Sequence, residues 1–384
     1  MKKKISILGS TGSIGLSALS IIEKEKNKFK PYIFSANKNY SLICKQIKKF
    51  KPVFFVIKDH KIFEKVSNRF KKNKIKIFKD FNFLKRNKCH LTISAIPGIA
   101  GLEPTLKMIS NSQKILIANK ESIICGWKLI SNKAKKKGTQ LIPIDSEHYS
   151  IFKLLNEEKI SSVKKIYLTA SGGPFLNLSL KQFKNIRPDQ ALNHPKWKMG
   201  KKISIDSSTL MNKIFELIEA QKLFNIPLKK LDILIHPNSL VHAILELENG
   251  LFKFIYHETS MKIPLANAIF DGEVKINKFF NSKKFFGNEN LVFKKINKKK
   301  FPAIKLKEKI ANYPSAPIII NAANEVLVDQ FLAKKIAYMD INKIIMAILR
   351  DKNYKKYAIR SPKNINQIFL IDSWARTITM KKIT

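Results

Sequence analysis

The sequence predicts an α/β protein in three folded parts: an N-terminal doubly wound parallel sheet, a central α+β domain and a C-terminal helical bundle. Up to about residue 145, short apolar runs alternate with helical stretches, which is the pattern of a parallel sheet with crossover helices. From about residue 160 strands of alternating polarity appear, and after about residue 300 the pattern is helical. At 384 residues the chain is long enough for two or three domains.

Composition narrows the class of protein. Hydrophobic residues make up 45% of the chain and no apolar run approaches membrane-spanning length, so we expect a soluble globular protein with no membrane partner. The three cysteines, Cys44, Cys89 and Cys125, are odd in number and far apart. They favour neither a disulfide framework nor a zinc site, and they indicate a reducing cytoplasm.

The net charge of +45 on its own suggests a nucleic-acid partner. The lysines are, however, spread along the chain among Ile, Asn and Phe, which are residues with AT-rich codons. Base bias of the genome explains this composition better, so we predict no nucleic-acid partner. A positive field still attracts small anionic substrates, which fits phosphate chemistry.

The first element is a buried strand over residues 4–8, followed at once by the turn GSTGSIG at residues 9–15 and by a helical pattern. Strand, glycine-rich turn and helix form the first half of a βαβ unit, which binds a pyrophosphate with turn amides and the helix N-terminus. The spacing is GxxGxxG rather than GxGxxG, so a plain tight turn is the alternative. The same glycines interrupt what could otherwise pass for a signal peptide. The candidate cofactor-binding residues of the turn are Ser10, Thr11, Gly12, Ser13 and Ile14.

The second strand, residues 31–36, ends without the acidic residue that binds the ribose hydroxyls of NAD. Asn37, Lys38 and Asn39 follow instead, and a lysine with small polar groups favours a 2′-phosphate, hence NADP. A solvated lysine in a lysine-rich chain is the alternative. Further strands at 52–57, 90–96 and 114–119 complete a Rossmann-like sheet.

The apolar run 140–144 ends abruptly in Asp145, Ser146 and Glu147. Pro143 suits the last strand of a sheet, and open α/β sheets place ligands beyond the carboxyl ends of their strands. If the chain stays extended, Asp145 and Glu147 aim two carboxylates at one point, which predicts a Mg²⁺ or Mn²⁺ site. A helix N-terminus capped by Asp145 or Ser146 is the competing interpretation.

The central part holds two polar loops. The strand 164–170 runs into Ser171 and two glycines, which suits an oxyanion, and the loop 193–200 carries Trp197, either as a lid or as a core residue. We expect a strand at 202–206 and a cap for the next helix from Ser207, Ser208 or Thr209.

In the helix 209–224, Asn212, Lys213 and Glu216 share one face. Lys213 and Glu216 are either a surface pair or groups that serve a phosphorylated polyol and its metal, with Glu216 as third carboxylate. Antiparallel strands follow at 231–236 and 241–257, with a type I′ turn at Asn249–Gly250. Beyond residue 300 we expect helices, one capped by Asp340 and one led in by Asn364 or Asn366.

Taken in order, the segments GSTGSIG, AIPG, ANKES, PIDSEH, SGGPF, HPKWKMG, KISIDSSTLMNK, IHPNSLVHA and NAANE resemble the 1-deoxy-D-xylulose 5-phosphate reductoisomerase family, from residue 4 to about residue 330. The resemblance implies conversion of 1-deoxy-D-xylulose 5-phosphate and NADPH to 2-C-methyl-D-erythritol 4-phosphate, with Mg²⁺ or Mn²⁺, in the non-mevalonate isoprenoid pathway. It also implies a V-shaped homodimer. The implied chemistry is a retro-aldol and aldol rearrangement followed by reduction with hydride.

The resemblance also implies roles for individual residues. Metal ligands are Asp145, Glu147 and Glu216, which with Lys213 and His194 form the catalytic set. The implied substrate contacts are Ser146, Glu147, Ser171, His194, Trp197, Ser207, Asn212, Lys213 and Glu216. Trp197 and Met199 belong to a closing flap. Cofactor contacts, besides the turn and residues 37–39, are Asn119, Lys120, Glu121, Gly200 and Met261. Asn37 stands where the family usually has glycine, which places cofactor affinity in question.

With this resemblance, the expected boundaries are an NADPH-binding domain at 1–145, a catalytic domain with metal site and flap at 146–271, a linker at 272–300 and a helical domain at 301–384. Another NADP-dependent dehydrogenase, such as a semialdehyde dehydrogenase, is a rival, but it needs a nucleophilic cysteine and nothing pairs Cys125 with a base. A nucleic-acid-binding protein, argued from charge alone, is the rival from another class.

Overall fold

The computed structural model describes residues 2–84, 88–281 and 290–383. The chain divides into two compact units. Unit 1 comprises residues 1–122, 128–149 and 260–283, and unit 2 comprises residues 123–127, 150–259 and 284–384. Within the described residues, no helix is both long and apolar enough to cross a membrane.

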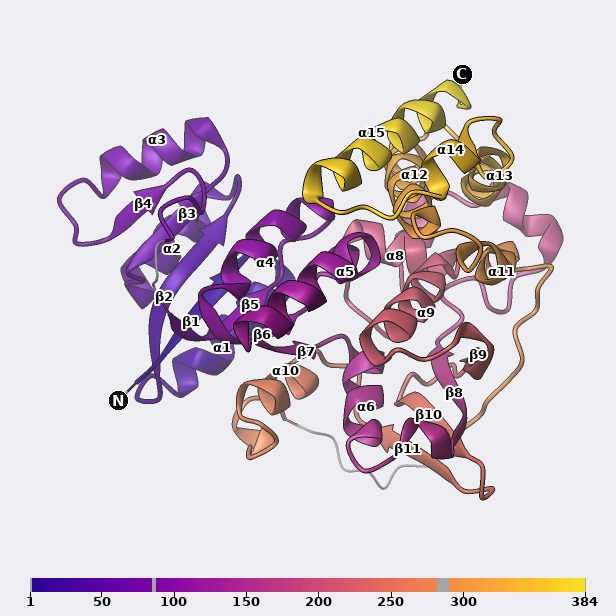
Figure 1. Cartoon of the computed structure of the whole chain (residues 1–384), viewed down its shortest axis with the longest axis horizontal. Helices are drawn as coiled ribbons and strands as arrows, with labels where there is room; N and C mark the ends of the chain where they lie inside the picture. Colours follow the sequence, from indigo (N-terminus) through magenta and orange to yellow (C-terminus); the bar gives the residue numbers. More distant parts are fainter. Residues whose placement is uncertain (1, 85–87, 282–289, 384) are drawn as a thin grey trace. The chain divides into compact units, whose positions relative to one another are not determined.

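Unit 1 is built on a seven-stranded sheet of order β4-β3-β2-β1-β5-β6-β7 (Figure 1). Every neighbouring pair is parallel, which confirms the predicted doubly wound sheet. The strands are β1 (Lys3–Leu8), β2 (Phe29–Ala36), β3 (Phe54–Ile57), β4 (Lys76–Phe78), β5 (Cys89–Ser94), β6 (Ser112–Ile117) and β7 (Gln140–Pro143). The connecting helices are α1 (Ser13–Lys24), α2 (Tyr40–Phe50), α3 (His60–Arg69), α4 (Leu102–Ile109) and α5 (Lys120–Lys137).

The order of the strands reverses between β1 and β5, so the loops after these two strands meet at the switch point where such sheets bind ligands. Gly9 follows β1 with φ +81°, and a Cβ atom there would lie 2.5 Å from the carbonyl oxygen of Ala95, which follows β5. Only glycine fits this close approach. Glycine at position 9 is therefore required by the close approach of the loops that follow β1 and β5.

Strand β7 is the edge strand of the sheet, as predicted, and it ends at Pro143. Helix α6 (Ser146–Leu155) starts three residues later. Helix α10 (Lys262–Ile269) belongs to unit 1, where Phe270 at its end packs against Phe29 with ring centroids 5.7 Å apart. The boundary expected at residue 271 thus does not coincide with the division into units, and the four-part division stays a prediction. Residues 282–289 of the expected linker lie outside the described part of the chain.

Unit 2 contains a four-stranded sheet of order β11-β10-β8-β9. Its strands are β8 (Val163–Ala170), β9 (Leu231–Ile235), β10 (Val241–Leu247) and β11 (Phe252–Tyr256). Strand β10 is antiparallel to β8 and β11, but β9 is parallel to β8, so the prediction that β9 is antiparallel is wrong. Helix α9 (Met211–Phe224) forms the crossover that parallel pairing requires.

The turn between β10 and β11 also differs from the prediction. Leu247 N–H donates to the Leu251 carbonyl at 2.9 Å, which encloses three residues, and among them Gly250 has φ +85°. A type I′ turn needs positive φ at Asn249 as well, and Asn249 does not have it. The connection is therefore a three-residue loop with its left-handed residue at the glycine.

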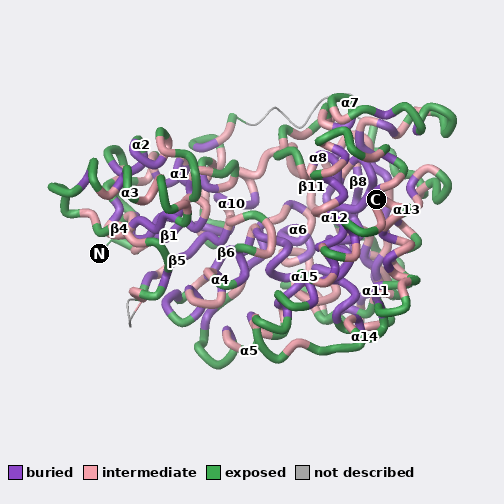
Figure 2. The backbone as a smooth tube through the Cα atoms, turned by 90° about the horizontal axis from the view of Figure 1, so that it is seen from above, coloured by how far each residue is buried: buried purple, intermediate pink, exposed green. Residues whose placement is uncertain are grey.

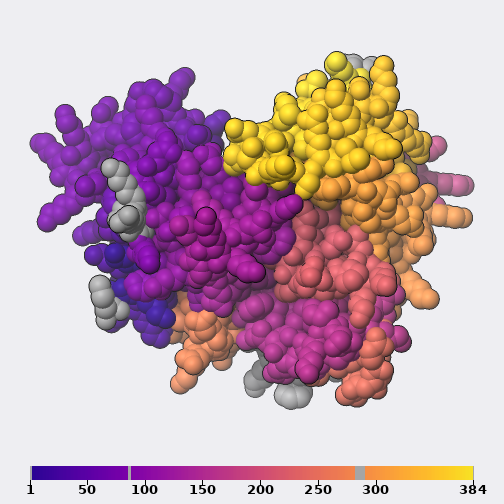
Figure 3. Space-filling view, viewed as in Figure 1, coloured from indigo at the N-terminus to yellow at the C-terminus, as the bar shows by residue number. Residues whose placement is uncertain are grey.

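The other helices of unit 2 are α7 (Pro188–Leu192), α8 (Lys201–Ser208), α11 (Leu306–Ile310), α12 (Ala316–Leu332), α13 (Tyr338–Ile348), α14 (Tyr354–Ala358) and α15 (Ile365–Lys381). In Figure 3 the yellow residues at the C-terminal end of the chain form one continuous surface region, and Figure 2 shows β8 and α12 as mostly buried backbone. Asn364 caps α15 by accepting from Gln367 N–H at 3.0 Å, as predicted. Asp340 is not the cap of α13, because it lies inside the first turn and accepts from Ala337 N–H at 3.0 Å.

The predicted strand at 202–206 is wrong, because these residues form α8. Ser204, Ile205 and Asp206 are all buried in succession, so the alternation that suggested a strand does not match the burial. The predicted cap of α9 by Ser207, Ser208 or Thr209 is also wrong. Leu210 is the N-cap residue, with φ +65°, and Thr209 contributes only a long 3.4 Å bond from Met211 N–H.

Candidate active site

Asp145 lies between the end of β7 and the first turn of α6. One carboxylate oxygen, Oδ1, accepts from Glu147 N–H at 3.1 Å and is 3.3 Å from His148 Nδ1, and the other, Oδ2, is 3.4 Å from Lys120 Nζ. Burial raises the pKa of Asp145, but the Lys120 ammonium and the hydrogen bond and charge of His148 outweigh it and hold the pKa well below its ordinary value. The carboxylate is therefore ionised at neutral pH.

The chain is helical from Ser146, so the extended backbone expected at Glu147 is wrong, but a carboxylate oxygen of Asp145 and one of Glu147 still lie within 4.8 Å of each other, as the prediction of two neighbouring carboxylates requires. The competing interpretation, a helix cap, is correct for Asp145, whose carboxylate accepts from Glu147 N–H. Ser146 Oγ donates to Glu147 Oε2 at 2.6 Å. Capping and ionisation are compatible, since a helix N-terminus favours a negative charge.

The glycine-rich turn exposes its tip. The accessible residues are Thr11, Gly12, Ser13 and Ile14. Gly12 is the N-cap of α1, and no side chain caps the first backbone N–H groups of this helix. Ser10 is instead fully buried, and its hydroxyl donates to Gln46 Oε1 at 2.6 Å. The accessible backbone of the turn can bind a phosphate, whereas the Ser10 side chain supports the turn from within.

Asn37, Lys38 and Asn39 are exposed at the carboxyl end of β2, the strand beside β1. Asn39 Oδ1 accepts from Leu42 N–H at 3.1 Å and so caps α2. Asn37 is not among the described residues with positive φ, so this position does not need the conformational freedom of glycine. Lys38 remains accessible as a cationic group beside the glycine-rich turn.

Asn119 organises the loop between β6 and α5. Its Oδ1 accepts from Ser122 N–H at 2.7 Å, and its Nδ2 donates to the carbonyls of Ile96 at 2.5 Å and Gly98 at 3.0 Å. Asn119 thereby joins the loops that follow β5 and β6. Lys120 and Glu121 follow in the first turn of α5, and Met261 lies at the N-terminus of α10 in the same unit.

In unit 2, Ser171 and His194 are in contact. Gly172 and Gly173 have φ +84° and +64°, and Ser171 Oγ accepts from Gly173 N–H at 3.0 Å and lies 2.9 Å from His194 Nε2. A Cβ atom on Gly173 would lie 3.2 Å from the Ser207 carbonyl oxygen. The loop after β8 therefore packs directly on the end of α8, where Ser207 lies.

The protonation state of His194 follows from its partners. Its Nδ1 accepts from Lys196 N–H at 3.2 Å and from Trp197 N–H at 3.0 Å, so Nδ1 carries no proton. Burial, with the charge of Lys213, lowers the pKa of His194 to about 4. His194 is then the neutral Nε2–H tautomer and donates to Ser171 Oγ. With two bonds accepted, Ser171 directs its own proton to another acceptor.

Helix α9 supplies a buried polar cluster. Asn212 Nδ2 donates to Glu216 Oε1 at 2.5 Å, and Lys213 Nζ lies 2.6 Å from Glu216 Oε2. The side chains of Lys213 and Glu216 are 9% and 1% exposed, so the surface-pair interpretation is wrong. A buried ion pair of this kind costs desolvation and is weak evidence for stability, which favours a functional reason for its presence.

The loop 193–200 is half-buried at Trp197 and Met199 and exposed at Gly200. The Trp197 ring meets His242 edge-on, with centroids 6.0 Å apart and an interplanar angle of 67°. Trp197 is thus neither a core residue nor fully solvated.

Sequence reasoning missed two groups near these residues. Asp206, 1% exposed in α8, accepts from Asn324 Nδ2 at 2.7 Å and lies 2.8 Å from Lys202 Nζ. His257 stacks on His242 with centroids 3.9 Å apart. The signal available for the Asp206 contact was Asn324 of the NAANE segment. No local pattern in the sequence pointed to the contact between His242 and His257.

Comparison with known proteins identifies the family. The chain is 45% identical over 373 residues to the 1-deoxy-D-xylulose 5-phosphate reductoisomerase of Pelagibacter ubique (strain HTCC1062), covering 95% of this chain and 96% of that protein. The chain belongs to the 1-deoxy-D-xylulose 5-phosphate reductoisomerase family. The enzyme of the same description from Wolbachia pipientis wMel is 39% identical over 386 residues, covering 99% and 97%.

Models of the reductoisomerase family match along most of the chain. The model described as 1-deoxy-D-xylulose 5-phosphate reductoisomerase matches residues 5–126, and two models described as C-terminal domains of this reductoisomerase match residues 141–224 and 257–378. The third match extends past residue 330, where the resemblance seen in the sequence ended.

Solved structures of the family share the fold. The crystal structure of DOX-P reductoisomerase in complex with NADPH, fosmidomycin and magnesium is 32% identical with a TM-score of 0.91, covering 99% of this chain and 98% of that chain. The reductoisomerase from Zymomonas mobilis in complex with NADPH is also 32% identical, with a TM-score of 0.90 and coverage of 100% and 99%.

Proposed function

We propose that this chain converts 1-deoxy-D-xylulose 5-phosphate to 2-C-methyl-D-erythritol 4-phosphate with NADPH and a divalent metal, in the non-mevalonate isoprenoid pathway. The observation that carries the proposal is the family match along nearly the whole chain, with relatives 45% and 39% identical. Related structures that hold NADPH, magnesium and fosmidomycin support the choice of cofactor and metal.

Asp145, Glu147 and Glu216 are the proposed metal ligands. Carboxylate oxygens are the donors that Mg²⁺ and Mn²⁺ prefer, and Lys120 with His148 keeps Asp145 ionised, so the donor set fits such a cation. When bound, the cation would supply Lewis acidity to the carbonyl and hydroxyl oxygens of the substrate, and NADPH would supply the hydride.

The substrate phosphate is assigned to unit 2. Ser171 directs its hydroxyl proton outward because His194 and Gly173 both donate to its oxygen. Ser207 lies beside this loop, and Asn212 and Lys213 begin the helix that follows. Ser146, Glu147, His194, Trp197 and Glu216 complete the proposed substrate contacts. Since His194 is neutral at pH 7, its proposed role is to orient Ser171 rather than to carry a positive charge.

The proposed NADPH site is on unit 1. The accessible amides of residues 11–14 receive the pyrophosphate, and Lys38 pairs with the 2′-phosphate. Ser10, Asn37, Asn39, Asn119, Lys120, Glu121 and Met261 complete the proposed cofactor contacts of unit 1, and Gly200, in the loop 193–200 of unit 2, is a further proposed contact. We also propose that residues 193–200 form a flap that excludes water during reduction.

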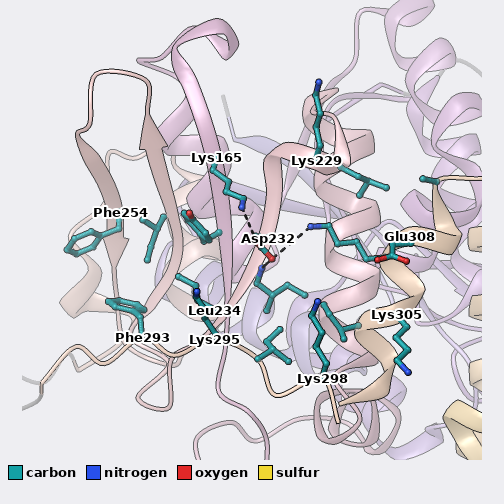
Figure 4. Close-up of a pocket in the computed structure, with 18 of the residues that line it drawn as sticks. Lys165, Lys229, Asp232, Leu234, Phe254, Phe293, Lys295, Lys298, Lys305 and Glu308 are labelled. Atoms are coloured by element: carbon teal, nitrogen blue, oxygen red, sulfur yellow. Dashed lines mark hydrogen bonds and ion pairs between the residues drawn. The ribbon is translucent and has the colours of Figure 1, made fainter. Parts of the chain in front are cut away.

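We further propose a cytoplasmic homodimer that forms through the outer face of the unit 2 sheet. This face holds a groove of about 1160 Å³ whose lining includes Phe252, Phe254 and Phe293, which are 58%, 46% and 36% exposed (Figure 4). Asp232 on its floor contacts Lys165 at 3.2 Å and Lys307 at 3.9 Å, so part of the lysine charge around it is neutralised. Exposed aromatics beside an edge strand favour a second copy as the occupant. A Phe254→Glu variant that stays dimeric by sedimentation would contradict this.

The test of function is NADPH oxidation followed at 340 nm with 1-deoxy-D-xylulose 5-phosphate, with Mg²⁺ or Mn²⁺ and then with chelator. We expect metal-dependent oxidation that Glu216→Gln and Glu147→Gln both abolish, while the exposed Glu157→Gln keeps it. Circular dichroism checks the fold of each variant. Folded wild-type protein that oxidises no NADPH with either metal would refute the proposal, and turnover by Glu216→Gln equal to wild type would refute the metal assignment.

A further inference from the structure

Three aromatic rings of unit 2 are in contact, and one of them belongs to the loop 193–200. His257 follows β11, His242 lies on β10, and Trp197 belongs to the loop. The rings of His242 and His257 are stacked, with centroids 3.9 Å apart and an interplanar angle of 23°. The edge contact of Trp197 with His242, at 6.0 Å and 67°, extends this column to the loop.

His257 is itself fixed at the base of the column. Its Nδ1 lies 2.8 Å from the carbonyl oxygen of Glu258, which can only accept, so Nδ1 carries a proton. Its backbone N–H donates to the Leu240 carbonyl at 2.9 Å. Burial lowers the pKa of His257, so the ring is neutral at pH 7, and its Nε2 has no hydrogen-bond partner among the described residues.

His257 holds His242 in two ways. Its ring covers the face of the His242 ring, and its carbonyl oxygen lies 3.2 Å from His242 Nε2, which must donate. His242 is 2% exposed, so it has little room to tilt on its own. His257 therefore contributes to both the plane and the rotation of the His242 ring.

The loop 193–200 is held at His194 and at the Trp197 ring. His194 Nδ1 accepts from Trp197 N–H, and His194 Nε2 donates to Ser171, the residue that follows β8. The start of the loop is thereby fixed to the end of β8. The Trp197 ring is attached through His242. Removal of support under His242 is expected to free the tryptophan while the histidine attachment remains.

We infer that His257 is a positioning residue for the flap: through His242 it holds Trp197 in place over the proposed substrate phosphate site. The contact between the rings stands on the structure of unit 2, whereas the consequence for substrate rests on the proposed function. His257 touches neither substrate nor cofactor in this inference, so it acts only through the ring next to it.

Limited proteolysis of the unliganded full-length chain tests the column without any assumption about activity. Lys196 and Lys198 are exposed on either side of Trp197, so trypsin cleavage at these two lysines, quantified by mass spectrometry, reports freedom of the loop. His257→Ala is expected to raise the initial cleavage rate about two- to tenfold, the factor that loss of one aromatic contact gives. His257→Phe keeps a stacking ring and is expected to stay near wild type, as is the exposed control His60→Ala.

A second variant protects the test from a folding defect. Trp197→Ala removes the upper end of the column at a half-buried position, and the double variant with His257→Ala is expected to be cleaved no faster than Trp197→Ala alone. Three outcomes would each overturn the inference. The first is a double variant that is cleaved faster than Trp197→Ala, as expected if the two effects add. The second is equal cleavage of His257→Ala and wild type, and the third is a His257→Phe variant that is cleaved as fast as His257→Ala.

Steady-state kinetics test the consequence for substrate. His257→Ala is expected to raise KM for 1-deoxy-D-xylulose 5-phosphate by about the factor by which it raises the initial cleavage rate, while kcat changes less. His257→Phe is expected to have a KM near that of wild type. Faster cleavage with unchanged KM would overturn the positioning role. Wild-type protein without turnover would refute the proposed function instead, and the proteolysis result would still decide whether the column exists.

Discussion

Replacement of Lys213 by methionine tests the buried cluster of α9. Its ammonium lies 2.6 Å from Glu216 Oε2, and the two side chains are 9% and 1% exposed. Removal of one partner of a buried ion pair costs about 3–5 kcal/mol, because the other charge loses its compensation inside the protein. The Asn212 amide remains on Glu216 Oε1, but a neutral donor replaces only part of the lost interaction. We expect a loss of about 3 kcal/mol.

Lys222 provides a matched control on the same helix. Burial lowers its pKa to about 8, and its Nζ donates to the carbonyl oxygen of Ile124 at 2.6 Å rather than to a carboxylate. Lys222→Met removes a buried charge and leaves no carboxylate of the α9 cluster unpaired. This variant is therefore expected to lose less than about 1 kcal/mol of unfolding free energy, and a gain in stability agrees with the same reasoning.

Calorimetric unfolding of metal-free protein measures the difference. At about 2 °C per kcal/mol for a domain of this size, Lys213→Met is expected to lower Tm by about 6 °C. The double variant with Glu216→Gln is expected to recover most of this loss, because it removes the buried negative charge that faced the Lys213 ammonium. The reasoning is refuted if Lys213→Met unfolds at the same temperature as Lys222→Met, or if the double variant is less stable than Lys213→Met.

Three further outcomes are expected. Gly9→Ala brings a Cβ atom to 2.5 Å from a backbone oxygen at positive φ, whereas Gly138→Ala has positive φ but open space around the new atom. Urea unfolding should therefore show that Gly9→Ala loses at least about 2 kcal/mol more stability than Gly138→Ala. Equal losses would contradict the steric argument. The pKa of His194 falls from 6.5 to about 4 on folding, so the unfolded chain takes up a proton first and stability declines as pH drops from 6.5 toward 4. His194→Gln should lack that part of the decline, which thermal unfolding across this range detects as a shallower slope. Asn324→Ala removes the amide donor of buried Asp206 and should cost about 1–3 kcal/mol, while Asn324→Asp, which sets two carboxylates together, should cost more; an unchanged unfolding midpoint in both would show that the contact does not contribute.

Unit 1 was predictable because its signals are local. Apart from the edge strand β4, which is partly exposed and was not predicted, its strands are short and mostly buried apolar runs. They alternate with helices whose caps, such as Asn39 and Asn119, are visible in the sequence. The glycine turn was also visible, although the reason for Gly9 is a contact with the loop after β5, about 85 residues away, which no local pattern shows.

Unit 2 was harder because tertiary burial overrides local pattern. Ile203 and Ile205 alternate with polar residues as in a strand, but the segment is a helix whose Asp206 and Ser204 are buried. Strand β9 pairs in parallel with β8 because α9 connects them, and an isolated apolar run carries no information about its direction. The His242–His257 contact joins two neighbouring strands at their ends, and only the register of the sheet brings the rings together.

The candidate site shows why a structural interpretation and a functional one need not exclude each other. The sequence left Asp145 as either a helix cap or a metal ligand, and its carboxylate does accept from the first turn of α6. That bond, the helix N-terminus and the Lys120 ammonium all stabilise the ionised carboxylate, and the pKa of Asp145 is held well below its ordinary value. An ionised carboxylate fixed in orientation is also what a hard cation needs from a ligand. The cap is therefore compatible with the proposed metal role of Asp145, and the two interpretations that the sequence left open do not exclude each other.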